Sequence, residues 1–225
     1  MTTETWKVLF GHALTLIDDV LQHGTKDLYW TFGGGTVLML RHNHRFSKDI
    51  DIFVPDPQAL GFVTPRLSSH AETLTSDYTE AGNFVKLFLP EGEIDFVASP
   101  NLTDEPYVLQ ELLGRTVRVE TSAEIIAKKL WHRGDRLTAR DIFDFALVAE
   151  REPDELDGAA EFLVRHIEPM FDQLERNAAM LRLQFDAIAT LDYNPGYDHA
   201  VAVLKDRLLA CKQMLEEGPA SRHRP

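Results

Sequence analysis

Cysteine and long apolar runs are both scarce in this sequence. Among its 225 residues Cys211 is the single cysteine, which excludes an internal disulfide framework and a cysteine-based metal site. No apolar run approaches the ~20 residues that a membrane-spanning helix needs. The first five residues lack the basic and apolar pattern of a signal peptide. These absences lead us to expect a cytoplasmic protein without a membrane segment.

Basic side chains are also in the minority. The chain carries 23 Lys and Arg against 36 Asp and Glu, a formal net charge of −13. A protein that grips a long nucleic acid through its backbone usually has a broad basic surface. The composition therefore does not favour a large nucleic-acid footprint, and any RNA contact would depend on a local basic patch.

Turn residues and alternating apolar residues divide the first half of the chain into short elements. Apolar residues recur at helical spacing over residues 4–23, and Gly24 is a suitable stop. The stretch 57–75 is ambiguous and fits a broken helix. Runs rich in β-branched and aromatic residues predict strands at 28–32, 50–54, 84–89, 94–98 and 116–120.

After Thr121 the pattern becomes helical. Helices are predicted at 123–134, 138–150, 155–166, 168–191 and 197–217. We therefore predict an α+β fold with a mixed sheet flanked by helices over residues 1–120 and a helical domain over 121–217. The end of the chain, 218–225, is expected to be a flexible tail.

A glycine-rich turn, Gly33-Gly34-Gly35-Thr36, follows the first predicted strand and precedes a short predicted helix at 36–41. Glycines at such a place let the backbone approach a ligand closely, and amides at a helix N-terminus suit a phosphate. Turns of this kind are common, so the turn indicates a phosphate-binding site only when other residues point to the same function.

That support comes from Asp49 and Asp51, at the start of the predicted strand 50–54. Because residues i and i+2 of a strand point to the same face, the two carboxylates should lie side by side. Like charges at this spacing repel, and a hard cation such as Mg²⁺ is a suitable counter-ion. Two such ions, together with substrate phosphates, support an in-line displacement at phosphorus. The alternative is two unrelated acids on a solvent-facing strand.

Asp95 is a third acid, flanked by the apolar residues Ile94 and Phe96 of another predicted strand. A carboxylate inside an apolar strand is unfavourable unless it pairs or coordinates. If the two strands are neighbours, Asp95 joins the same metal cluster and is a candidate acceptor for the proton of the nucleophile. Glu93, which points to the same face, is the alternative.

The chain resembles the polymerase-β-like nucleotidyltransferase superfamily in its Gly34-Gly35-Thr36 turn, its Arg45-x-Ser47-x-Asp49-Ile50-Asp51 run and Asp95. The lysine run Ala123–Leu130 and the Arg140–Asp144 run resemble the lysine and RD-x-x-D motifs of the AbiEii toxin family. That family comprises the toxin components of abortive-infection toxin–antitoxin systems. The resemblance covers residues 30–150, while residues beyond 150 match only in being helical.

This resemblance implies a role for each matching residue. Metal ligands would be Asp49, Asp51 and Asp95, holding two Mg²⁺ ions. Nucleotide contacts would come from Gly34, Gly35, Thr36, Arg45, Ser47 and Lys128. Lys129, supplied by the helical domain, would neutralise charge on the triphosphate, with Lys128 as its alternative. Asp141 would complete the site by positioning Lys129, and Asp144, three residues further along the same helix, is the alternative.

The implied reaction transfers a nucleoside monophosphate from a nucleoside triphosphate (NTP) to an acceptor hydroxyl and releases pyrophosphate. The family points to RNA, such as a tRNA 3′ end, or to another component of translation as the acceptor, and to a cognate antitoxin as a partner. Nucleotidylation of a protein or a small molecule is one alternative. Another is a non-catalytic partner protein that keeps the fold and binds nucleotide, although a retained carboxylate cluster speaks against it.

Overall fold

The structure, a computed structural model, describes residues 4–24 and 26–217. Contacts divide these residues into two units. Unit 1 contains the residues up to Asn101 together with Tyr107–Thr121, and unit 2 contains Leu102–Pro106 and the residues from Ser122. The predicted tail 218–225 lies outside the described residues. Within the described ranges, every helix is too short or too polar to cross a membrane.

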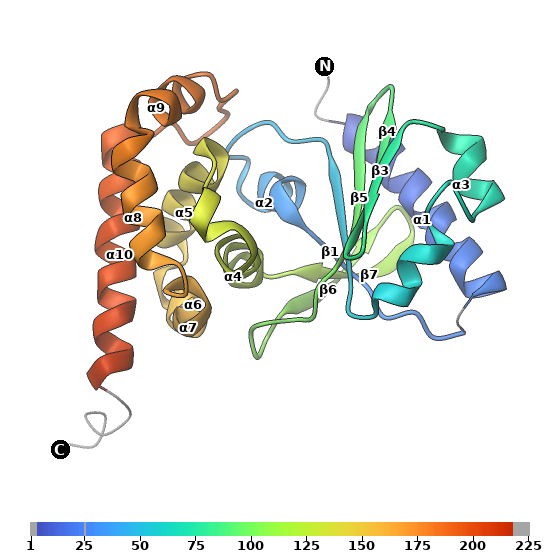
Figure 1. The fold of residues 1–225 in the computed structure, drawn as a ribbon, viewed down its shortest axis with the longest axis horizontal. Helices are drawn as coiled ribbons and strands as arrows, with labels where there is room; N and C mark the ends of the chain where they lie inside the picture. The colour runs from blue at the N-terminus through green and yellow to red at the C-terminus, as the bar shows by residue number, and fades with distance from the viewer. Residues whose placement is uncertain (1–3, 25, 218–225) are drawn as a thin grey trace. The chain divides into compact units, whose positions relative to one another are not determined.

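Unit 1 is built on one mixed sheet. Its strands are β1 (Thr31–Gly33), β2 (Ile50–Val54), β3 (Tyr78–Ala81), β4 (Phe84–Leu89), β5 (Gly92–Ala98), β6 (Tyr107–Leu112) and β7 (Arg115–Glu120). Its helices are α1 (Thr5–His23), α2 (Gly34–His42), the 3-10 helix η1 (Pro57–Phe62) and α3 (Ser69–Leu74). The strands lie in the order β3-β4-β5-β2-β1-β7-β6, and α1 and α3 lie together on one side of them (Figure 1).

The centre of the sheet mixes parallel and antiparallel pairs. Strand β2 runs parallel to β5 and antiparallel to β1, while β7 runs parallel to β1. The order confirms the predicted mixed sheet flanked by helices, and it makes the strands that carry Asp51 and Asp95 immediate neighbours.

One row of side chains across the five inner strands of this sheet is apolar. Paired positions place Val119, Phe32, Ile52, Phe96 and Val85 on successive strands, and all of them are buried. The ring of Phe10 from α1 stacks on Phe32 with the ring centroids 4.6 Å apart. Since neighbouring residues of a strand point to opposite faces, the next row along the strands lies on the opposite face.

Most sequence-predicted elements of unit 1 are confirmed. The first helix, the strands at 50–54 and 84–89 and the broken helix within 57–75 have their counterparts in α1, β2, β4 and η1 with α3. The first predicted strand was placed too early, because β1 spans only Thr31–Gly33. Strands β3 and β6 were not predicted, since both lie at the edges of the sheet and carry mixed, largely exposed side chains.

Unit 2 is helical. Its helices are α4 (Ser122–Arg133), the 3-10 helix η2 (Gly134–Arg136), α5 (Ala139–Arg151), α6 (Pro153–Asp157), α7 (Ala160–Leu163), α8 (Ile167–Arg176), α9 (Ala178–Asp186) and α10 (Tyr197–Glu217). Helix α5 is buried over most of its length, and α10 packs along it (Figure 1). The ring of Phe185 contacts Phe143 at 5.4 Å and Tyr197 at 5.5 Å between centroids.

Two predicted helices of unit 2 are each divided. The predicted helix 155–166 is interrupted between α6 and α7, where Gly158 ends the first of them. The predicted helix 168–191 is interrupted at Asn177, which separates α8 from α9. Glycine and asparagine are both poor residues for a helix interior, so each break has a local cause.

A buried carboxylate fixes the segment that enters unit 2. Glu124 on α4 is fully buried and accepts hydrogen bonds from the backbone amides of Leu102 and Thr103 and from the Thr103 hydroxyl. The ammonium of Lys128, one turn further along, lies 3.2 Å from the same carboxylate. Leu102 and Thr103 are therefore held to α4 by one side chain.

Replacing this carboxylate by an amide is expected to destabilise unit 2. In Glu124→Gln the buried Lys128 loses its counter-charge and the backbone amides lose a charged acceptor. The free energy of unfolding should fall by about 3 kcal/mol. Urea denaturation measures this change. Glu168→Gln, which alters an exposed pair with Lys212, is the matched control and should change stability by about 0.5 kcal/mol or less.

Candidate active site

The row of side chains next to the apolar row is polar. Gly33 pairs with Asp51, Asp51 with Asp95, and Asp95 with Lys86. The carboxylate of Glu120, on β7, lies over Gly33, because a Cβ atom at Gly33 would meet Glu120 Oε2 at 2.1 Å. We call these five residues, Glu120, Gly33, Asp51, Asp95 and Lys86, the polar row. It lies on the face of the sheet opposite to Phe10 and Phe32.

The glycine turn is shaped by this row. Gly34 has a φ of +75°, a conformation that favours glycine, and a Cβ atom there would meet Asp51 Oδ2 at 1.8 Å. A Cβ atom at Gly35 would meet the guanidinium of Arg45 at 2.7 Å and Ser47 Oγ at 3.1 Å. The sequence motif is glycine-rich because these side chains occupy the space that larger residues would need.

Thr36 joins the glycine turn to the loop that precedes β2. Its buried hydroxyl donates a hydrogen bond to the carbonyl oxygen of Asp49 at 2.6 Å and lies 3.1 Å from Ser47 Oγ. The glycine turn and the loop that carries Asp49, thirteen residues after Thr36, are therefore side by side. Thr36 fixes the loop, and the residues that line the turn itself are Gly34, Gly35 and Ser47.

Asp49 and Glu93 lie beside the polar row. The amide of Glu93 donates a hydrogen bond to Asp49 Oδ1 at 3.1 Å. The ammonium of Lys86 lies 3.0 Å from Asp95 Oδ2 and 2.5 Å from Glu93 Oε2. Lys86 on β4 thus pairs with two carboxylates of the neighbouring strand β5, and Asp49 is joined to the same place by the Glu93 amide.

Burial and mutual repulsion shift the pKa values here. Burial raises the pKa of Asp95 above its usual value; Lys86 opposes this shift, whereas Glu93 and Asp49 add to it. Burial alone would lower the pKa of Lys86, but its pairs with Glu93 and Asp95 outweigh burial and raise it. The cluster holds more negative charge than its lysine neutralises.

The residues of the polar row fit a divalent cation in part. In the described chain, no group of three or more His, Cys, Asp or Glu side chains is arranged to hold a metal ion. Asp49 Oδ1 is turned toward Glu93, and Asp95 Oδ2 is occupied by Lys86. Asp95 Oδ1, however, is buried and has no hydrogen-bond partner among the described residues. A carboxylate that binds a metal ion is expected to have such a buried oxygen without a hydrogen-bond donor before the ion binds.

Sequence reasoning missed two members of the polar row, Lys86 and Glu120. The position of Lys86 could have been found by counting, because the two-residue turn Pro90–Glu91 joins β4 to β5 and pairs residue 86 with residue 95. Glu120 was predicted only as the end of a strand. It is fully buried, and the Thr31 hydroxyl donates a hydrogen bond to its Oε1 at 2.7 Å.

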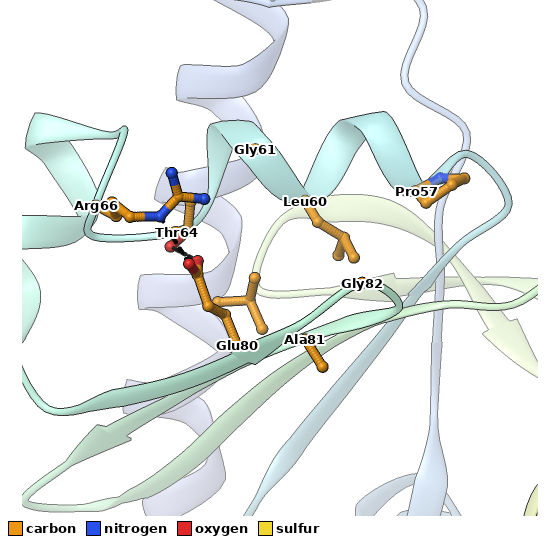
Figure 2. Close-up of a pocket in the computed structure, with 9 residues that line it drawn as sticks. Pro57, Leu60, Gly61, Thr64, Arg66, Glu80, Ala81 and Gly82 are labelled. Carbon is orange, nitrogen blue, oxygen red and sulfur yellow. Dashed lines mark hydrogen bonds and ion pairs between the residues drawn. The ribbon is translucent and has the colours of Figure 1, made fainter.

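A cavity of about 340 Å³ lies on the other face of the sheet. Figure 2 shows it between η1 and the β3–β4 hairpin, with Glu80 contacting Thr64 and Arg66. Its wall includes Glu80 and Val85, a pair whose side chains point away from Lys86. The cavity is therefore separate from the polar row.

The predicted residues of unit 2 form a cluster of their own. The ammonium of Lys129 lies 2.9 Å from Asp141 Oδ1 and 2.8 Å from Asp144 Oδ2. Asp141 also accepts hydrogen bonds from Arg133 and from Thr138, whose hydroxyl caps helix α5. Lys129 thus contacts both aspartates that the sequence left as alternatives.

The pH dependence of folding should report this cluster. Burial alone would raise the pKa of Asp141, but Lys129 and Arg133 lower it from 3.8 to about 2. A lowered pKa stabilises the folded state above pH 3.8, and that contribution is lost as the pH falls toward 2. Urea denaturation from pH 5 to pH 2 should show that Asp141 accounts for a loss of about 2 kcal/mol. Asp141→Asn should be less stable at pH 7 and lack this part of the acid dependence; an unchanged acid profile would contradict the prediction.

A mixed sheet whose neighbouring strands present carboxylates beside a glycine-rich strand-to-helix turn is the arrangement expected from the resemblance to nucleotidyltransferases. Residues 15–211 of the sequence match the family described as "Nucleotidyl transferase AbiEii toxin, Type IV TA system". This chain belongs to that AbiEii family, which confirms the predicted resemblance and extends it well beyond residue 150. No curated protein matches the chain.

Two solved structures share the fold. MenT4, a nucleotidyltransferase toxin from Mycobacterium tuberculosis, is similar with a TM-score of 0.56 and 19% identity, over 94% of this chain and 84% of MenT4. JHP933 from Helicobacter pylori is similar with a TM-score of 0.51 and 17% identity, over 95% of each chain. At these identities the likeness concerns the fold alone, and it extends through both units of this chain.

Proposed function

We propose that this nucleotidyltransferase moves a nucleoside monophosphate from an NTP to an acceptor hydroxyl. The acceptor oxygen bonds to the α-phosphorus, the bond to the pyrophosphate oxygen breaks, and pyrophosphate leaves. Asp95 is the candidate to take the hydroxyl proton, since burial raises its pKa. The observation that carries this proposal is the pairing of Asp51 with Asp95 across two strands, next to the glycine turn.

Magnesium is the metal that we propose for this site. Asp51 and Asp95 would hold the ion. Asp49 would join them if its Oδ1 released the hydrogen bond from the Glu93 amide and bound the ion instead. Support comes from the buried, unpartnered Asp95 Oδ1. When bound, such ions neutralise the charge that develops on the phosphoryl oxygens. The sequence-based expectation of two ions stays a prediction.

Nucleotide binding is proposed for the glycine turn and the loop beside it. The backbone of Gly34 and Gly35 opens α2, and amides at a helix N-terminus favour phosphate. Ser47 lies against Gly35, and the buried guanidinium of Arg45 lies over the same residue. Thr36 serves this site by holding the loop in place.

We also propose that Lys129 neutralises charge on the triphosphate. Its two aspartate partners hold the ammonium in one place, and Asp141 acts as a positioning residue because Lys129, Arg133 and Thr138 occupy its oxygens. Lys128 lies against the buried Glu124 instead, which favours a structural role for that lysine.

The acceptor that we propose is the end of an RNA, such as a tRNA 3′ end, with a cognate antitoxin as the partner that limits the activity. Membership of a toxin family supports both. The net charge of −13 favours contact with a short segment over a long footprint. The same negative charge is compatible with a hydroxyl group of a protein or a small molecule, which is the competing acceptor. We place the reaction in the cytoplasm, where NTPs and RNA are available.

One experiment separates these acceptors. Purified protein, Mg²⁺ and each NTP labelled at the α-phosphate are incubated with total RNA, with protein extract and with neither. Label in RNA, lost in the Asp49→Ala/Asp51→Ala double variant, is the expected result. Label in protein would replace the RNA acceptor with a protein one. Absence of label in every mixture, together with absence of Mg²⁺-dependent NTP binding, would refute the catalytic proposal.

A further inference from the structure

Lys86 lies at the end of the polar row, where sequence motifs assign no residue. It pairs directly with Asp95 in the register of β4 and β5. Its ammonium contacts Asp95 Oδ2 and Glu93 Oε2, and its side chain is 30% exposed. The ammonium therefore occupies one oxygen of a proposed metal ligand and leaves the other oxygen, Oδ1, facing its buried surroundings.

The charges around this lysine explain why it is needed. Asp95 and Glu93 both contact the Lys86 ammonium, and Asp49 lies beside them because its Oδ1 accepts a hydrogen bond from the Glu93 amide. Carboxylates that repel one another in a partly buried place are unfavourable unless a cation lies among them. The Lys86 ammonium supplies that cation.

We propose that Lys86 provides a fixed positive charge within the polar row, and that this charge sets the affinity of the polar row for divalent metal ions. The ammonium balances Asp95 and Glu93 while no ion is bound, and it lowers the affinity of the row for a free ion. Mg²⁺ is bound through few carboxylates plus substrate phosphates, so this balance favours entry of the metal together with the triphosphate. This inference rests on the proposed metal site of Asp51 and Asp95.

Metal binding without nucleotide tests the proposal directly. The full-length wild type and the variants Lys86→Met, Lys86→Arg and Lys212→Met are titrated with Mn²⁺. Electron paramagnetic resonance measures the concentration of free Mn²⁺ at each step. Removing a positive charge next to a metal ligand should tighten Mn²⁺ binding by about tenfold in Lys86→Met. Lys86→Arg keeps the charge and should bind as the wild type does. Lys212→Met removes a lysine that pairs with Glu168 and should also be unchanged.

A change of opposite sign provides a second test, which does not depend on the folding of Lys86→Met. Glu93→Gln removes a competing partner of Lys86 and one negative charge, while its backbone amide still reaches Asp49. Mn²⁺ should bind several-fold more weakly to this variant. Circular dichroism checks that each variant is folded, and Lys86→Met should melt at a lower temperature than the wild type without metal and recover with saturating Mn²⁺.

The outcomes distinguish this inference from the proposed function. If Asp51→Asn weakens Mn²⁺ binding while folded Lys86→Met and Glu93→Gln bind as the wild type does, the role of Lys86 is refuted and the metal site stands. If Asp51→Asn leaves Mn²⁺ binding unchanged, the metal site is refuted, and the role of Lys86 with it. Tighter binding by Lys86→Met and weaker binding by Glu93→Gln together support the proposal.

Discussion

Asp51→Asn is expected to reduce nucleotidyl transfer by about a thousandfold while the protein remains folded. Asp51 is the central residue of the polar row, because it pairs with Gly33 on one side and with Asp95 on the other and lies against Gly34. An amide at this position has almost the same shape, but it carries no charge for a divalent ion. Initial rates of transfer at saturating NTP measure the effect.

The matched control is Asp172→Asn, which removes an exposed aspartate that pairs with Arg176 on α8. Its rate should equal that of the wild type. A folded Asp51→Asn protein that retains more than about a tenth of the wild-type rate would mean that Asp51 is not a metal ligand.

Gly34→Ala is expected to have the second largest effect. The residue has a φ of +75°, which costs a non-glycine residue about 1–2 kcal/mol. The added methyl group would also lie 1.8 Å from Asp51 Oδ2, so the carboxylate or the turn must move. A displacement of about 1 Å at a reacting centre lowers rates by about a hundredfold. We therefore expect a fall of this size in transfer rate and weaker NTP binding.

Gly82→Ala is the control for this substitution, because nothing lies within 4 Å of a Cβ atom at Gly82 and its φ lies outside the left-handed region. It should leave rate and NTP affinity unchanged. Calorimetric titration with NTP and the transfer rate are measured on both variants. If Gly34→Ala behaves as Gly82→Ala does, the glycine turn does not approach the nucleotide.

Strands β2, β4, β5 and β7 were predictable from the sequence and β1 only roughly, while the edge strands β3 and β6 were not. In β2 the apolar residues Ile50, Ile52 and Val54 alternate with polar or half-exposed ones, so the period-two pattern gives both bounds. In β6 the side chains of residues 108–111 are exposed, and its pairing with β7 rather than burial makes it a strand. Pairing partners are non-local, and a local pattern does not contain them.

The candidate site was predictable as far as its acids. Asp49, Asp51 and Asp95 were identified from spacing and from their apolar flanks, and the register of β2 with β5 now explains why Asp51 and Asp95 belong together. Their ligand roles remain a proposal. Glu120 was missed because its place over Gly33 depends on a parallel pairing of β7 with β1, which distant parts of the chain supply.

The contacts of the two adjacent lysines are visible only in three dimensions. Helical spacing places Lys128 and Lys129 on different faces of α4, but it does not say which face is buried against what. The structure gives Lys128 the buried Glu124 as a partner and gives Lys129 the pair Asp141 and Asp144. Sequence alone left both lysines and both aspartates as alternatives.

The most direct test of the proposed reaction is the mass balance of a single transfer. A defined RNA is incubated with protein, Mg²⁺ and one NTP. The mass of the intact RNA is measured by mass spectrometry, and the amount of pyrophosphate is measured in the same sample. The proposal predicts an RNA heavier by whole nucleoside monophosphates, with one pyrophosphate released for each unit added. Release of inorganic phosphate with a nucleoside diphosphate, or pyrophosphate without any added mass on an acceptor, would contradict it.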